Sequence, residues 1–561
     1  MEVVLRLEFN HIYKSTEKEE LLEYLKRLSK ETIINIIGFA DNNNRLNYDT
    51  FFSNPAKQKE INQLVLGYIH YTKFEGKISV WSREASIFLS EMILSNREAL
   101  INENTVETDP DEEELNLFKA FLVINEKIKK EDGLNASDTK DGVEKIAEIS
   151  IALKLGTADL GLFSEIDIEL LKLAYVTSYK FNELLNFLKT NVEYTYLIND
   201  LCNYFNQKSL EKLSYHVDFL LLQVVRCNQA NTSILKIEDG ELIDFLQSLT
   251  SNEIIAEIDF LQVRNHPLFQ LDESTYSIIE PFFVLDKFTK SVKFILKKSY
   301  EQENGLDQND RSFFSFYNKI FAEEFLMTRL LDYIFAKQYF IKLDDVSKDD
   351  NKPDYYIRNN SNIFVFEYKD VLINKEIKTS GNYVEIRDEL KNKFLCNSKN
   401  SKPVGIGQLI NHIKAISDKS FAFDGKINHS KKHTVYPILL LSDRLLEIPG
   451  INYIMNKWLR EELPEVRNNL FVKDFILADI DTLIFYSEYL KSKDRNFRDR
   501  LDDHINKMKK PAKGYGKTNL DLTRTSTSKI SKKLAPFSSR FSIDMFDRNL
   551  FVDKFSHLIR T

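Results

Sequence analysis

The chain has 561 residues, a length that exceeds one hydrophobic core and predicts about two to four domains. Its 43% hydrophobic and 29% charged residues are ordinary for a globular protein, and no uncharged apolar stretch is long enough to span a bilayer. The net charge of −8 argues mildly against a generally basic nucleic-acid binder, although the charge is segregated along the chain.

The first residues and the cysteines indicate a cytoplasmic protein without membrane association. The N-terminal residues have neither the apolar segment nor the small-residue cleavage site of a secretory signal. The three cysteines, Cys202, Cys227 and Cys396, are too few and too scattered for a disulfide framework or a zinc ribbon. We therefore expect a reducing environment.

Residues 1–230 are expected to form a mainly α-helical region. Apolar residues recur at helical spacing in several segments, namely 19–28, 83–100, 111–130, 163–189 and 208–226. No motif in this region indicates chemistry. Residues 231–305 are expected to be a mixed connecting region, in which 267–279 reads as a β-hairpin and the polar stretch 301–310 marks a boundary.

Residues 306–505 alternate between helical and strand patterns. A strong helix is predicted from Phe313 to about Gln338, and the short strands 355–358 and 363–366 flank a turn. Two further apolar strands are expected at 435–441 and 474–478, with helices between and after them. This order predicts an α/β domain with a mixed, partly parallel sheet flanked by helices.

Three residues of this domain carry the main chemical signal: Asp354, Glu367 and Lys369. Glu367 and Lys369 end an apolar strand and share one of its faces, because alternate side chains of a strand point the same way. Asp354 begins the neighbouring strand of the hairpin, which can bring its carboxylate beside Glu367. Two close carboxylates repel unless a cation lies between them, and a hard divalent cation such as Mg²⁺ suits oxygen ligands. A lysine beside such a site can stabilise the charge on an attacked phosphate.

The segments Pro353-Asp354 and Glu367-Tyr368-Lys369 resemble the PD-(D/E)xK nuclease superfamily, which has the restriction-endonuclease-like fold. The resemblance covers about residues 311–500. It implies a Mg²⁺-dependent nuclease, with Mn²⁺ as a substitute, in which Asp354, Glu367 and the backbone carbonyl of Tyr368 bind the metal and Lys369 is catalytic. Glu-x-Lys occurs four times in the chain, but only the copy at Glu367 follows an apolar strand and a Pro-Asp pair.

Two further elements extend the resemblance. Superfamily members often carry a glutamate on the helix before the hairpin, where it helps to hold the metal or its waters. Helical periodicity favours Glu324 over Glu323 for this role. Several branches carry Gln-x-x-x-Tyr on a later helix, where this chain has Gln408 and, in place of the tyrosine, His412. One turn apart, these two side chains would share a face toward a phosphate or base. For Glu324 and His412, an ordinary role at the edge of a helix remains open.

Residues 506–561 are expected to form a basic C-terminal segment. Between residues 506 and 540 ten Lys or Arg accompany a single acid, Asp521. Such a segment can follow a phosphate backbone, or it can be a solvated linker. We assign nucleic-acid binding to its lysines, namely Lys509, Lys510, Lys513, Lys517, Lys532 and Lys533.

The resulting hypothesis is a cytoplasmic, Mg²⁺-dependent endonuclease that cuts DNA in preference to RNA and serves microbial anti-phage defence. By analogy of architecture, the helical N-terminal region would bind a protein partner or form a homo-oligomer. Three alternatives stay open: a catalytically silent nuclease fold that binds nucleic acid or acts as a scaffold, an RNA-directed or toxin-like nuclease, and a helical interaction protein in which the pattern is accidental.

Overall fold

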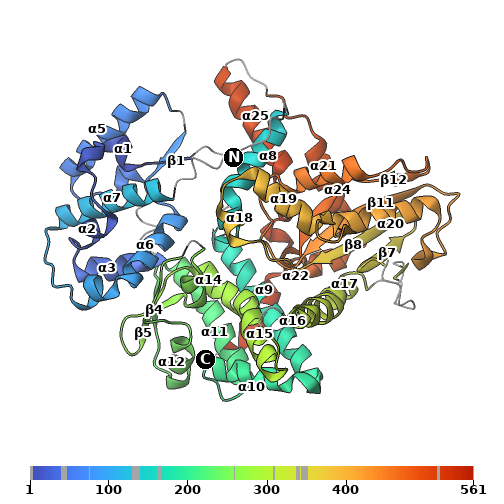
Figure 1. The fold of residues 1–561 in the computed structure, drawn as a ribbon, viewed down its shortest axis with the longest axis horizontal. Coiled ribbons are helices and arrows are strands. Elements are labelled where there is room, and N and C mark those ends of the chain that lie inside the picture. The colour runs from blue at the N-terminus through green and yellow to red at the C-terminus, as the bar shows by residue number, and fades with distance from the viewer. Residues whose placement is uncertain are drawn as a thin grey trace. The chain divides into compact units, whose positions relative to one another are not determined.

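The computed structural model describes residues 4–39, 47–74, 76–128, 139, 141–160, 166–257, 259–307, 310–336, 341–342, 352–514 and 519–559 (Figure 1). The chain forms two compact units. The N-terminal unit comprises residues 2–129 and 164–299, and the C-terminal unit comprises residues 130–163 and 300–560. None of the helices within the described ranges is long and apolar enough to cross a membrane.

The N-terminal unit is mainly helical, as expected. Its longer helices are α3 (Lys30–Ile37), α5 (Pro55–Thr72), α6 (Arg83–Ser95), α7 (Pro110–Lys127), α9 (Ile166–Thr190), α10 (Thr195–Tyr204) and α11 (Leu210–Gln229). The predicted hairpin is confirmed, because β4 (Leu268–Gln270) and β5 (Thr275–Ile278) pair antiparallel. The strand β3 (Ile234–Lys236) completes a three-stranded antiparallel sheet.

A six-stranded mixed sheet forms the centre of the C-terminal unit, which confirms the α/β prediction at this level. Its path is β12 (Leu470–Val472), β11 (His433–Leu441), β8 (Asn362–Lys369), β7 (Tyr355–Asn359) and β6 (Ile341–Lys342), and β13 (Ile476–Asp479) also pairs with β11. The strand β8 is antiparallel to β7 and parallel to β11. Pro437 lies where the neighbour of β11 changes from β12 to β13, so its missing N–H is tolerated inside a central strand.

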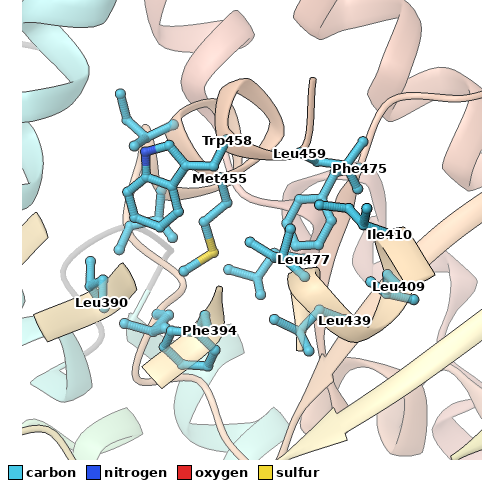
Figure 2. Close-up of a cluster of buried hydrophobic side chains, with 14 of the residues drawn as sticks. Leu390, Phe394, Leu409, Ile410, Leu439, Met455, Trp458, Leu459, Phe475 and Leu477 are labelled. Carbon is cyan, nitrogen blue, oxygen red and sulfur yellow. The ribbon is translucent and has the colours of Figure 1, made fainter. Parts of the chain in front are cut away.

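Both faces of β8 are covered, because apolar side chains point to each side of the strand. Ile363 and Val365 point into a core shared with α19 (Tyr383–Phe394), α20 (Ile406–Asp418) and α21 (Ile451–Glu462). Figure 2 shows part of this core, where Leu390 and Phe394 lie on the side of Met455 and Trp458, and Leu409 lies on the side of Leu439. On the opposite face Phe364 stacks on Tyr436 at 4.8 Å between ring centroids, and α24 (Arg495–Lys509) contributes Phe497 beside Phe366.

The helix α8 (Gly142–Lys154) comes from the N-terminal half of the sequence but belongs to the C-terminal core. Its Ala147 and Ile151 are buried in the same cluster as Trp458 and Leu439. Tyr453 on α21 also donates a hydrogen bond to Asp141, the N-cap of α8, over 3.1 Å. The compact units therefore divide the chain differently from the expected boundaries at 230, 305 and 505, because long-range packing rather than sequence order defines the core.

The basic segment also belongs to the C-terminal unit. The helix α24 continues to Lys509, and α25 (Asn519–Leu534) packs against both α24 and α21. Arg540 is buried and donates from Nε to Nδ1 of the buried His504 over 3.1 Å. The segment is thus a packed part of the fold in its described residues, rather than a linker.

Gly450 allows α8 to approach α21 closely. Its φ of +103° lies in the left-handed region, and a Cβ at this position would lie 2.7 Å from Cβ of Ala147. We expect Gly450→Ala to destabilise the C-terminal unit by about 2–4 kcal/mol, from backbone strain and overpacking. Urea unfolding followed by Trp458 fluorescence, in a Trp81→Phe background that leaves one tryptophan, would measure this loss.

Ala147→Gly provides the matched control, because it removes the clashing Cβ at a cost of about 1 kcal/mol in helix propensity. The double variant should be more stable than the sum of the two single effects predicts, by roughly 1 kcal/mol or more. Cα of Ala147 would still lie 2.8 Å from the added Cβ, so the relief is partial. Strict additivity would show that Cβ of Ala147 does not contribute to the loss of stability.

Candidate active site

The β7–β8 hairpin sets the two predicted carboxylates opposite each other. Tyr355 pairs with Phe366 and Asn359 with Asn362, while Asn360 in the turn has a φ of +55°, which asparagine adopts at low cost. Continuing this register by one residue places Asp354 opposite Glu367. Directly opposed residues on one face of an antiparallel pair have neighbouring side chains.

Asp354 is fixed by the backbone of the neighbouring strand. Its Oδ2 accepts a hydrogen bond from the Tyr368 N–H over 2.7 Å. This N–H lies beyond the end of the paired register, which stops at Tyr355 and Phe366. The residue before it, Pro353, has no N–H with which to extend the ladder. A side-chain oxygen therefore satisfies a β8 donor that the β7 backbone leaves unpaired, and the carboxylate is held at the end of the hairpin.

Glu367 is completely buried and both of its oxygens have partners. Lys369 Nζ lies 3.2 Å from Oε2, and His412 Nε2, from α20, lies 2.9 Å from Oε1. Lys369 Nζ also lies 3.5 Å from Asp354 Oδ2, so one ammonium group bridges the two carboxylates. The predicted trio is therefore brought together, and His412 joins it.

Burial and crowding shift the acidities in this cluster. Burial, and then the charge of Asp354, raises the pKa of Glu367, although His412 and Lys369 oppose the rise. Burial alone would lower the pKa of Lys369, but the charges of Asp354 and Glu367 outweigh it and raise that pKa. The ammonium form of Lys369 is thus stabilised by the carboxylates that it bridges.

A third carboxylate acts on the cluster, and it is Glu323 rather than the predicted Glu324. Burial, and then the charge of Asp354, raises the pKa of Glu323 to about 8, with a further contribution from Glu367. Glu324 is exposed. Asn318, five residues before Glu323, donates from Nδ2 to the backbone carbonyl of Asp370 just beyond β8 over 3.3 Å, so this face of the helix meets the end of the strand.

The difference between Glu323 and Glu324 has a backbone cause. The predicted helix exists, but its middle is a π-helix, η7 (Phe316–Met327), between α16 (Ser312–Ser315) and α17 (Thr328–Ile334). Bonding from i to i+5 widens each turn and rotates side chains away from the positions that 3.6 residues per turn would give. The prediction of Glu324 assumed the narrower period. The two adjacent acids, Glu323 and Glu324, are visible in the sequence, whereas the π-helical turn is not.

Gln408 has a structural contact instead of the predicted one. Its Oε1 accepts a hydrogen bond from the Gly405 N–H over 2.9 Å, which caps the start of α20. Of the Gln408 and His412 pair, only His412 contacts a member of the site. Glycine is a favoured N-cap, and a glutamine three residues later can reach back to the N-cap N–H, so this contact could have been expected from the sequence.

The lysines assigned to nucleic acid have mixed surroundings. Lys509 Nζ lies 3.2 Å from Asp474, and Lys533 Nζ donates to the carbonyl of Lys510 while lying over the Tyr453 ring. Lys510, Lys513 and Lys532 are exposed, and Lys517 lies outside the described residues. Part of the positive charge therefore serves the packing of α24 and α25.

The ligand chemistry of the cluster fits a hard divalent cation. Asp354, Glu367 and the Tyr368 carbonyl offer oxygen atoms, and the carboxylates of Asp354, Glu367 and Glu323 outnumber the one lysine. Within the described ranges, no group of three or more His, Cys, Asp or Glu side chains is arranged to hold a metal ion. The proposed set has only two side-chain ligands, and Lys369 Nζ lies between them, so a metal fits only if this ammonium moves aside.

Compared with protein-family models, with curated proteins and with solved structures, the chain gives no match.

Glu323 should give the C-terminal unit a specific pH dependence in the absence of divalent metal. Its pKa of about 8 in the folded chain exceeds the ordinary value of 4.5, so the unfolded chain ionises first. Stability from this group is therefore complete below about pH 4.5 and is lost as the pH rises through about 8. Glu323→Gln should remove this loss, which urea unfolding at several pH values would measure.

The neighbouring variant Glu324→Gln serves as the control, because that side chain is exposed. It should keep most of the pH dependence of the wild type, because the charge of Glu324 ranks below burial, Asp354 and Glu367 among the causes that raise the pKa of Glu323. If the two variants exchanged roles, the site would contain Glu324 as the helical period predicts.

Proposed function

We propose that the chain is a metal-dependent endonuclease that hydrolyses phosphodiester bonds, with the restriction-endonuclease-like core in its C-terminal unit. The observation that carries the proposal is the pair of opposed carboxylates, Asp354 and Glu367, bridged by Lys369 at the end of a hairpin in a mixed sheet. Such a pair needs a neutralising cation, and the resemblance of Pro353-Asp354 and Glu367-Tyr368-Lys369 to the PD-(D/E)xK motif names the chemistry.

In this proposal the residues have separate roles. Asp354, Glu367 and the Tyr368 carbonyl would hold Mg²⁺, or Mn²⁺ in its place. The metal, when bound, would supply an activated water and neutralise charge on the attacked phosphate. Lys369 would turn from the carboxylates toward the phosphate and stabilise the negative charge that develops there. Glu323, on the face of η7 that meets the end of β8, would be the nearby carboxyl group that holds or passes on a proton.

We place DNA before RNA as the substrate and anti-phage defence in a microbial cytoplasm as the setting, with the N-terminal unit as the part that binds a partner or a second copy. These finer statements rest on the resemblance alone. The exposed lysines Lys510, Lys513 and Lys532 would contribute to binding the phosphate backbone.

One observation favours a second function, a catalytically silent nuclease fold that binds nucleic acid or acts as a scaffold. Lys369 already bridges both carboxylates, with Nζ 3.2 Å and 3.5 Å from their oxygens. If this bridge is stable, the cluster is a structural ion pair at the end of the hairpin. The two functions therefore differ in whether Lys369 can leave the carboxylates.

Cleavage assays with Mg²⁺ or Mn²⁺ on supercoiled plasmid, linear duplex, single-stranded DNA and RNA would test the proposal. We expect Asp354→Asn and Lys369→Ala each to lower the cleavage rate by at least about 100-fold, because each removes a group that acts in the transition state. Glu376→Gln and Lys375→Ala are matched controls at the exposed start of α18 (Lys375–Thr379) and should cut like the wild type.

Cutting that persists in both site variants would rule out this active site. Absence of metal-dependent cutting on all four substrates would favour the silent fold. A preference for RNA would keep the chemistry and replace DNA as the proposed substrate.

A further inference from the structure

His412 is buried beside Glu367 rather than exposed toward a substrate. It is only 5% exposed, and its Nε2 is committed to Glu367 Oε1 over 2.9 Å. A side chain buried this deeply, with its terminal nitrogen occupied, is poorly suited to reading a phosphate or a base. Its surroundings instead indicate a role that acts through Glu367.

The contact divides the two oxygens of Glu367 between two directions. Oε1 faces His412, whereas Oε2 faces Lys369 and the side on which Asp354 lies. Partial rotation of the carboxylate would break the contact on Oε1 and leave a fully buried oxygen without its donor, which is unfavourable for a charged group. The His412 contact thus restrains the orientation of the carboxylate plane, so that one oxygen is directed to the centre of the cluster.

His412 can restrain Glu367 because α20 restrains His412. Leu409 and Ile413, on either side of it in sequence, are fully buried in the core beneath the sheet. Phe421 meets the imidazole edge to face at 6.3 Å between centroids. The Gln408–Gly405 cap fixes the start of the same helix. A group carried by a packed helix holds its partner more tightly than one on a loop.

We propose that His412 is a positioning residue, which holds Glu367 Oε1 through Nε2 so that Oε2 faces Asp354 and the place of the divalent cation. The inference rests on the proposed nuclease function and adds a residue that the motif does not contain. Hydrogen-bond partners of metal-binding carboxylates commonly change metal affinity by about 10–100-fold when they are removed. His412 would act in this way without contacting metal or substrate.

The test titrates Mn²⁺ into the full-length chain by calorimetry and compares His412→Phe with His412→Gln. Phenylalanine fills the space but cannot donate, so the dissociation constant for Mn²⁺ should rise by about 10–100-fold. Glutamine offers an amide N–H at a similar reach and should bind Mn²⁺ within about threefold of the wild type, less than the loss expected without a donor. Cleavage rates should follow the same order.

His433→Phe is the matched control for the loss of a buried histidine. His433 is 4% exposed at the start of β11, where its Nε2 contacts the Asn428 carbonyl rather than the site. The control should leave the Mn²⁺ affinity unchanged even if it lowers the melting temperature. Melting temperatures of all variants without metal separate a loss of fold from a loss of positioning.

The outcomes distinguish failure of this inference from failure of the proposed function. If the wild type binds Mn²⁺ and cuts, and His412→Phe does the same, the positioning role is overturned and the nuclease stands. Equal loss of affinity in the Phe and Gln variants would also overturn it, since a donor would then not matter. If the wild type binds Mn²⁺ no better than Glu367→Gln does, the nuclease proposal fails and the positioning role fails with it.

Discussion

The repulsion between two opposed carboxylates is the constraint around which the C-terminal unit is arranged. The β7–β8 register sets Asp354 against Glu367, and the sheet then buries Glu367 completely. A buried, uncompensated charge is among the most costly features a fold can carry. The ammonium of Lys369 lies beside one oxygen of each carboxylate, the imidazole of His412 contacts the other oxygen of Glu367, and the backbone N–H of Tyr368 donates to Asp354. These partners come from β8 itself and from α20, so the compensation depends on the same packing that builds the core.

Much of this arrangement can be read from the sequence, because strand alternation is a local property. Apolar residues before Glu367, a short polar turn and a Pro-Asp pair predict a hairpin whose ends carry the acids, and the structure has that hairpin. The predictions that differ depend on geometry that no local pattern encodes. Glu323 replaces Glu324 because η7 is a π-helix, and Gln408 turns back to cap α20. Whether a helix adopts the wider turn is decided by the packing of its neighbours rather than by its own periodicity.

The position of α8 shows the same limit at the level of the whole chain. Its sequence is an amphipathic helix like several others in the N-terminal half, and nothing local distinguishes it. Yet its buried face completes the core formed by α19 and α21, with Gly450 permitting the close approach. The chain therefore enters the C-terminal unit at residue 130, leaves it after 163 and returns at 300. A fragment that begins at residue 300 would lack Ala147, Ile151 and Leu155 and would expose the apolar surface that they cover.

Lys369 decides how the cluster can be used. One ammonium cannot neutralise Asp354, Glu367 and Glu323 together. Burial, and then the charge of Asp354, raises the pKa of Glu323 even though Lys369 opposes the rise. Replacing the ammonium by a doubly charged cation would correct the deficit and free Lys369 for another anion, which in a nuclease is the scissile phosphate. The exchange gains charge neutralisation but must overcome desolvation of the incoming cation and loss of the Lys369 contacts. His412 holds Glu367 in both states, because its contact on Oε1 does not involve Lys369. The same geometry therefore serves a nuclease if the exchange is favourable and a structural ion pair if it is not.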